Sequence, residues 1–221
     1  MTEAAAVSRP TVRLEGFHAV KHALRFGAEL VEVRTDDPQR LAGLARDLAP
    51  DVADRLAEIA ERGPGPFPPT GVIGWARRPP FALPPPDHRF VVLLDHPRHL
   101  GNVGAAIRVA AAADAAAVIV TGTGDPWHAQ AIRGGAGLQF ALPVGRVEEL
   151  PDRPLVALDP GGEPLAGRVP PGAVLAFGSE RRGLSDELLA RADARLALPM
   201  RDGVSSLNLA TAVAATLYAL R

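Results

Sequence analysis

The sequence RFVVLLDHPRHLGNVGAAIRVAAAADAAAVIV, residues 89–120, sets the architecture of the larger part of this chain. Two continuous apolar runs, residues 89–95 and 116–120, have the composition of buried strands, and a helix-forming segment lies between them. Further short apolar runs follow at residues 155–158, 173–177 and 195–200. Such strands, alternating with helical patterns, predict an α/β fold with a mostly parallel sheet covered on both faces. Ligands of such sheets bind at the carboxyl ends of the strands.

Arg108 is the one residue with a polar side chain between Val103 and Ala113. Because this segment is apolar on every side, we expect it to be buried. A guanidinium cannot shed its charge, and burying it unpaired costs several kcal/mol. We therefore expect Arg108 to meet an acidic partner, a phosphate or a developing anion; a structural ion pair is the simplest of these.

Composition limits the class of protein. The chain has 221 residues, 47% of them hydrophobic, which is typical of a globular protein with one large domain or two small ones. The N-terminus lacks a signal-peptide pattern, and no apolar run is long enough to predict a membrane span. Without cysteine, disulfides and thiolate metal sites are excluded, and we expect a cytoplasmic protein. With a formal net charge of −1, any binding of nucleic acid must use a local basic patch.

The Pro-rich stretch PPFALPPP, residues 79–86, marks the clearest boundary, because it cannot continue a helix or a central strand. We predict a small α/β domain over residues 1–78, a linker over 79–87 and a larger domain over 88–221. Within the small domain the pattern predicts helices at residues 17–27, 38–48 and 51–63, and strands at 30–35 and 70–76.

The first of three informative loops runs from Asp95 to Ala110. Asn102 and Gly104 lie at the start of the predicted helix, and Arg108 follows about one turn later. Asparagine at such a position is most simply a helix cap, and glycine lets the backbone approach a ligand closely.

The second loop lies in FGSERRGLSDELL, residues 177–189, where an apolar strand runs into a polar segment. Glu180 lies at the end of this strand and can pair with Arg108; a solvated loop acid is the alternative. Arg181 and Arg182 are exposed charges that would contact phosphates if the loop faces RNA.

The third loop lies in LPMRDGVSSLNLATAVAATLYAL, residues 198–220. Ser205 or Ser206 is expected to cap a long apolar helix, and Asn208 is the last amide side chain before it becomes uniformly apolar. A helix this apolar needs more than one packing face, so we expect part of it to meet another part of the protein or a second subunit.

Together, in this order, the three loops make the chain resemble the SpoU (TrmH) family of RNA ribose 2′-O-methyltransferases in the SPOUT superfamily. The matching segments are NVGAAIR (102–108), FGSERRG (177–183) and LPMRDGVSSLN (198–208), and the resemblance covers about residues 88–221. The N-terminal part is similar to the small ribosomal-protein-like α/β substrate-binding domain of many members, through EGFHAVKHAL (15–24) and TGVIGWARRP (70–79).

The resemblance implies a sheet whose C-terminal segment threads a loop to form a trefoil knot, an exception to the rule that chains are unknotted. It implies S-adenosylmethionine as the cofactor, transfer RNA or ribosomal RNA as the substrate, and a homodimer formed by the larger domain. The implied cofactor contacts are Gly178, Leu198 and Leu207, with Met200, Thr121 and Gly122 nearby. The implied catalytic residues are Arg108, Asn102, Glu180, Ser206 and Asn208. One departure is Gly135, which stands where related proteins often have serine.

An alcohol is a poor nucleophile, and the family gives its arginine the role of activating it. A pKa above 12 makes Arg108 an awkward base, so we favour an electrostatic role at the phosphate and the developing oxyanion. His96 and His99 lack the carboxylate partners of a metal site, and we expect no metal. Two alternatives stay open: a catalytically silent knotted RNA-binding protein, and a nucleotide-dependent enzyme, for which the expected glycine fingerprints are missing.

Overall fold

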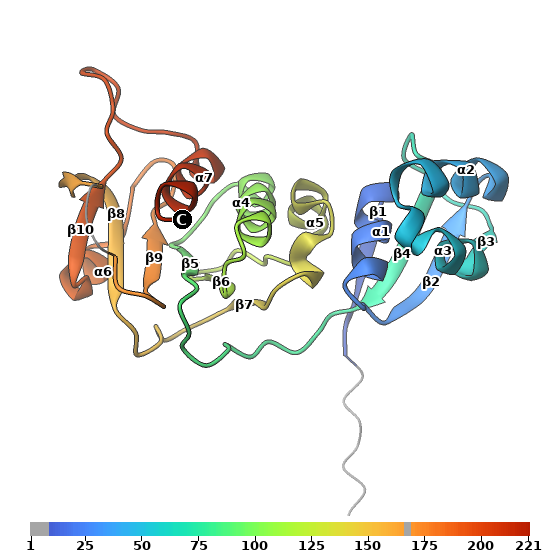
Figure 1. Ribbon diagram of the computed structural model, residues 1–221, viewed down its shortest axis with the longest axis horizontal. Helices are drawn as coiled ribbons and strands as arrows, with labels where there is room; N and C mark the ends of the chain where they lie inside the picture. The colour runs from blue at the N-terminus through green and yellow to red at the C-terminus, as the bar shows by residue number, and fades with distance from the viewer. Residues whose placement is uncertain (1–8, 166–168) are drawn as a thin grey trace, which may run out of the picture. The chain divides into compact units, whose positions relative to one another are not determined.

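The computed structural model describes residues 9–165 and 169–221. It divides into two compact units, one ending at Pro80 and the other running from Phe81 to Arg221 (Figure 1). The division lies within the Pro-rich stretch. None of the helices in the described ranges is both long and apolar enough to cross a membrane.

The N-terminal unit is a four-stranded sheet in the order β1-β4-β2-β3, with short helices between the strands. Its elements are β1 (Thr11–Glu15), α1 (Phe17–Arg25), β2 (Leu30–Thr35), α2 (Pro38–Leu48), η1 (Pro50–Val52), α3 (Ala53–Ile59), β3 (Ala60–Arg62) and β4 (Val72–Arg77). The bounds of the helix predicted at residues 51–63 are wrong at both ends: the segment begins in the 3-10 helix η1, and Ala60–Arg62 pair with β2 as strand β3. Pairing with β2 is a long-range interaction that the local pattern of Ala60–Arg62 does not show.

The C-terminal unit is a six-stranded sheet in the order β10-β8-β9-β5-β6-β7. Each neighbouring pair is parallel, which confirms the predicted sheet. Its elements are β5 (Val91–Leu94), α4 (Leu100–Ala112), β6 (Ala117–Val120), α5 (Ala129–Gly135), η2 (Leu138–Phe140), β7 (Val144–Arg146), β8 (Leu155–Pro164), β9 (Val174–Phe177), α6 (Asp186–Arg191), β10 (Ala194–Ala197) and α7 (Leu209–Ala219).

Helices cover both faces of this sheet (Figure 1). On one face, Val91 and Leu93 of β5 belong to a buried cluster that includes Leu188 of α6. Successive strand residues point to opposite faces, so Val92 and Leu94 face the other side, where α4 packs between α5 and α7. The central strands are therefore buried on both faces, which explains why they are continuously apolar.

A close contact between α4 and α5 determines how the first loop is placed. A Cβ on Gly104 would lie 2.0 Å from the backbone oxygen of Ala131, and one on Gly134 would lie 2.5 Å from the oxygen of Gly101. The expectation that Gly104 lets backbone approach a ligand is thus corrected: the close approach is to helix α5. Any side chain at residue 104 would push the two helices apart.

The Pro-rich stretch is more than a spacer, because its two apolar side chains belong to the C-terminal unit. Phe81 lies over β7, so that a Cβ on Gly145 would come within 2.2 Å of the phenyl ring. Leu83 packs with Phe81 against the buried cluster of the sheet. The domain that begins at residue 88 in our prediction therefore begins structurally at Phe81.

Candidate active site

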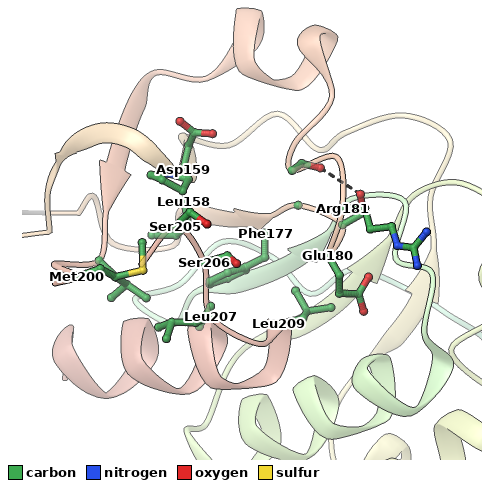
Figure 2. A pocket seen from close by; sticks show the side chains of 16 residues that line it. Leu158, Asp159, Phe177, Glu180, Arg181, Met200, Ser205, Ser206, Leu207 and Leu209 are labelled. Carbon is green, nitrogen blue, oxygen red and sulfur yellow. Dashed lines mark hydrogen bonds between the residues drawn. The ribbon is translucent and has the colours of Figure 1, made fainter. Parts of the chain in front are cut away.

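A cavity of about 380 Å³ lies at the carboxyl ends of β8, β9 and β10 (Figure 2). Its size falls in the range of small-molecule sites, about 300–1,000 Å³. Apolar side chains of β8, of β9 and of the segment from β10 to α7 line it: Leu158, Phe177, Leu198, Met200, Leu207 and Leu209. The structure therefore brings together four of the predicted cofactor contacts, Gly178, Leu198, Met200 and Leu207.

Sequence reasoning missed one wall of this cavity, which β8 provides. The pairing of β8 with β10 is interrupted, because Arg195 pairs with Ala157 whereas Leu196 pairs with Glu163. The intervening residues bulge out of the ladder and place Leu158, Asp159 and Pro160 in the lining. The sequence DPGG at residues 159–162 was the available signal, since Asp-Pro and Gly-Gly pairs are typical of turns.

Gly178 lies in a tightly closed turn at the end of β9. Ser179 and Gly183 exchange two backbone hydrogen bonds of 2.9 and 3.0 Å. A Cβ on Gly178 would lie 2.1 Å from the carbonyl carbon of Gly183, so no side chain fits there. Without a side chain at residue 178, the cavity is bounded at this point by backbone alone, which a ligand can approach closely.

Three polar residues from distant parts of the chain form one hydrogen-bonded cluster beside the cavity. Nδ2 of Asn102 donates to Oε1 of Glu180 over 2.8 Å, and Nδ2 of Asn208 donates to Oδ1 of Asn102 over 3.2 Å. Each of the three residues comes from a different one of the three loops. The three motifs are separate in the sequence, and the structure brings one residue of each into a single hydrogen-bonded cluster.

This cluster corrects two predicted helix caps. The N-cap of α4 is His99, and Asn102 lies inside the first turn with its side chain turned to Glu180. The N-cap of α7 is Asn208, whose Oδ1 accepts from the Ala210 amide over 2.9 Å. Neither Ser205 nor Ser206 is a cap. Both line the cavity instead.

Glu180 is held as a carboxylate. Partial burial raises its pKa, but the hydrogen bond from Asn102, the backbone amides of Glu180 and Arg98 and the charge of His99 outweigh burial and lower the pKa. Its second oxygen, Oε2, is enclosed and has no hydrogen-bond partner among the described residues. Asn102 therefore holds one oxygen of the Glu180 carboxylate, and the other oxygen is closed off from solvent.

Arg108 does not pair with Glu180, and it is exposed rather than buried. No ion pair or hydrogen bond joins its side chain to any residue in the described part of the chain. The reason is that α4 buries a stripe formed by Val103, Gly104, Ala106, Ile107 and Ala110, and residue 108 lies on the opposite side. An alanine-rich helix tolerates exposure on that side, so uniform apolarity did not imply uniform burial.

Thr121 and Gly122 do not line the cavity that holds Gly178. They line a different cavity, with His96 and Ser185. There Oγ1 of Thr121 donates to Asp95 over 2.7 Å. Their role as cofactor contacts stays a prediction.

Gly135 also lies away from this cavity, because it packs against the side chain of buried Gln139. Of the two histidines considered for a metal pair, His96 hydrogen-bonds Asp95 over 2.8 Å, and His99 caps α4. Within residues 9–165 and 169–221, no group of three or more His, Asp or Glu side chains is placed to hold a metal ion.

The model of the SpoU rRNA methylase family matches residues 89–218. The chain belongs to this family. A protein of Mycobacterium bovis named as an uncharacterized tRNA/rRNA methyltransferase is 31% identical over 203 residues, 81% of this chain and 70% of that protein. The 23S rRNA (uridine(2479)-2′-O)-methyltransferase of Streptomyces viridochromogenes is 28% identical over 229 residues, 92% of this chain and 79% of that protein.

A solved structure of a SpoU family member is similar across both units. The SpoU methyltransferase AviRb from Streptomyces viridochromogenes, in complex with the cofactor AdoMet, has a TM-score of 0.76 and 25% sequence identity. The match covers 93% of this chain and 87% of AviRb. AdoMet is S-adenosylmethionine, so a relative with this fold binds the cofactor that the motifs imply.

Proposed function

We propose that this protein transfers a methyl group from S-adenosylmethionine to a ribose 2′-hydroxyl of ribosomal or transfer RNA. The observation that carries the proposal is the cavity at the ends of β8, β9 and β10 with the Asn102–Glu180–Asn208 cluster beside it. The named activity of the Streptomyces viridochromogenes relative and the AdoMet-bound AviRb structure support it.

The residues of the cavity fit the cofactor. Phe177, Met200 and Leu207 offer apolar surface to an adenine and an aliphatic chain, and Asp159 and Glu180 offer negative charge to a cation. When bound, S-adenosylmethionine supplies a sulfonium methyl group that an oxygen nucleophile can attack. Asp159 itself is tied to Arg195 by an ion pair of 2.9 Å, which holds it at the cavity wall.

Each catalytic residue has a separate task in this proposal. Asn102 holds the Glu180 carboxylate, Asn208 holds Asn102, and Ser206 lies in the lining where it can donate to bound RNA. Arg108 binds the phosphate next to the target ribose and stabilises negative charge on the 2′-oxygen. Because Arg108 keeps its proton, a phosphate oxygen or water accepts the proton of the hydroxyl.

We also propose the arrangement that the family resemblance implies. The N-terminal unit serves as the RNA substrate-binding domain, and the C-terminal unit forms a homodimer through exposed residues of α7, such as Tyr218. For the knot, the support is that β10 pairs with β8 at one edge of the sheet, whereas the next helix, α7, returns to pack on α4. We propose the cytoplasm as the location of the reaction, because the chain has no cysteine and its proposed substrate is RNA.

The substitution Arg108→Ala tests the catalytic assignment. We expect methyl transfer to unmodified RNA to be abolished, whereas binding of S-adenosylmethionine and the free energy of unfolding (within about 0.5 kcal/mol) stay unchanged, because the side chain is exposed. Tritiated methyl transfer, calorimetric titration and urea unfolding measure the three quantities.

Two results would contradict the proposal. Retention of most of the activity by the Arg108→Ala variant would remove Arg108 from the mechanism. A wild-type protein that binds RNA but neither binds S-adenosylmethionine nor transfers methyl groups would instead be the silent RNA-binding protein.

A further inference from the structure

A second cavity, of about 610 Å³, opens between the start of α4 and helix α5. We call it the α4–α5 groove. Its polar lining comes from Arg98, His99, Asn102, Gln130 and Arg133, and it contains no carboxylate side chain. The guanidinium groups of Arg98 and Arg133 make the lining of the groove basic, and a basic lining favours an anion.

The neighbouring cavities differ from the α4–α5 groove in charge. The lining of the cavity at the ends of β8, β9 and β10 contains two carboxylates, Asp159 and Glu180, and one arginine, Arg181. Arg98 also lines a third cavity, of about 880 Å³, together with Arg182, but three carboxylates, Asp95, Asp125 and Asp186, are part of that lining. A polyanion is therefore better accommodated in the α4–α5 groove than in either neighbour.

The groove adjoins the candidate active site through two residues. Asn102 lines the groove and donates to Glu180. The backbone amide of Arg98 helps to lower the pKa of the same Glu180 carboxylate. An anion in the groove would thus lie next to the cluster that the proposed reaction uses.

The floor of the groove is rigid. Gly101 and Gly104 of α4 lie so close to α5 that a Cβ on Gly134 would contact the Gly101 oxygen at 2.5 Å. This contact fixes Gln130 and Arg133 on α5 relative to Asn102 on α4. The spacing of the two helices is therefore fixed, and Arg98 and Arg133 are exposed side chains on this fixed frame.

We propose that the α4–α5 groove binds a phosphodiester of the RNA chain beside the target ribose, with Arg98 and Arg133 as the anion-binding side chains. Guanidinium groups suit phosphate because they donate paired, charge-assisted hydrogen bonds. The side chains of Gln130 and His99 are further hydrogen-bond donors in the same lining. This inference rests on the proposed function for the identity of the anion, since RNA supplies a phosphate on each side of its ribose.

The test is RNA binding by Arg98→Gln and Arg133→Gln, measured with radiolabelled, in vitro transcribed 23S ribosomal RNA over a series of salt concentrations. We expect each variant to bind RNA about five- to tenfold more weakly near 0.1 M salt. The slope of the logarithm of the binding constant against the logarithm of the salt concentration should become less steep by about 0.7–0.9, because one phosphate contact is lost. Arg133→Lys keeps the charge and should retain the wild-type salt dependence.

Arg191→Gln is the matched control, because it removes the same charge from an exposed position of the C-terminal unit outside the groove. It should bind RNA with the wild-type salt dependence. Calorimetric titration with S-adenosylmethionine checks that every variant is folded. RNA binding by Arg98→Gln and Arg133→Gln that matches Arg191→Gln would overturn the inference.

Two further measurements distinguish RNA from a small anion as the ligand of the groove, and distinguish failure of the groove proposal from failure of the proposed function. Inorganic phosphate or uridine monophosphate, added in excess at constant ionic strength, should not displace the RNA; displacement would assign the groove to a small anion and overturn the inference. A wild-type protein that transfers no methyl group but shows groove-dependent RNA binding would refute the proposed function alone. A protein that methylates RNA while its groove variants bind normally would refute the groove alone.

Discussion

Asp95 shows, at the scale of a single residue, how this fold holds a charge at the end of a buried strand. It is 3% exposed, yet it accepts hydrogen bonds from Thr121 Oγ1, His96 Nδ1 and the Ser185 amide, each 2.7–2.8 Å long. Burial raises the pKa of the carboxyl group, but these hydrogen bonds outweigh it and lower the pKa below 3.8. Asp95 thus ties the loop after β5 to the start of α6.

The substitution Asp95→Asn tests this arrangement through stability. Because the folded pKa is lower than the unfolded one, the ionised group stabilises the fold above pH 3.8, and this contribution is lost as the pH falls through the folded pKa. We expect the variant to be less stable than the wild type by about 2 kcal/mol at pH 7, from hydrogen bonds to a charged acceptor. The difference should shrink as the pH falls below 3.8.

Urea unfolding at steps between pH 7 and pH 3 measures both effects. Asp114→Asn is the control, because the Asp114 side chain is 76% exposed, and its replacement should change stability by at most about 0.5 kcal/mol. A wild-type minus Asp95→Asn difference that is the same at pH 3 as at pH 7 would contradict the assignment.

At the scale of elements, glycine decides how closely helices α4 and α5 approach. Gly104 is buried against α5, whereas a Cβ on Gly101, in the same helix, would meet nothing within 4 Å. Both glycines lie in the first half of α4, and only the contacts with α5 distinguish them. The sequence therefore predicts the helix but not which of its glycines is required.

The pair Gly104→Ala and Gly101→Ala tests this difference. The first should destabilise the protein by about 1–3 kcal/mol, because the new methyl group meets the Ala131 backbone. The second should stabilise it by about 0.5–1 kcal/mol, the usual helix preference for alanine over glycine. Thermal and urea unfolding compare them, and equal stability of the two variants would rule out the close helix contact.

At the scale of the whole molecule, the chain divides into two compact units, and the division falls between Pro80 and Phe81. The last apolar residues of the Pro-rich stretch, Phe81 and Leu83, pack against the core of the C-terminal unit. Where the chain is cut should therefore matter in two ways: for RNA recognition and for the stability of the sheet.

Two truncations separate these effects. A fragment of residues 81–221 should bind S-adenosylmethionine like the full chain but bind RNA more weakly, because it lacks the proposed substrate-binding unit. A fragment of residues 88–221 should in addition be less stable by about 2–4 kcal/mol, since Phe81 and Leu83 no longer cover the core. Urea unfolding, calorimetry and filter binding measure the three quantities.

Either of two results would count against this division of labour. One is equal RNA affinity of the full chain and the 81–221 fragment. The other is equal stability of the two fragments, which would mean that the apolar residues of the Pro-rich stretch do not contribute to the core.

The sequence by itself determined the parallel sheet and the order of the three loops, and its resemblance to the SpoU family implied that Asn102, Glu180 and Asn208 belong to one site. Continuous apolar strands and motif spacing are local properties, so they can be interpreted without coordinates. The tertiary structure alone decided that Arg108 is exposed, that Gly104 contacts α5 and that β8 bulges to place Asp159 in the cavity. These three facts depend on which face of an element meets which neighbour, and that is a property of long-range packing, to which local composition contributes little.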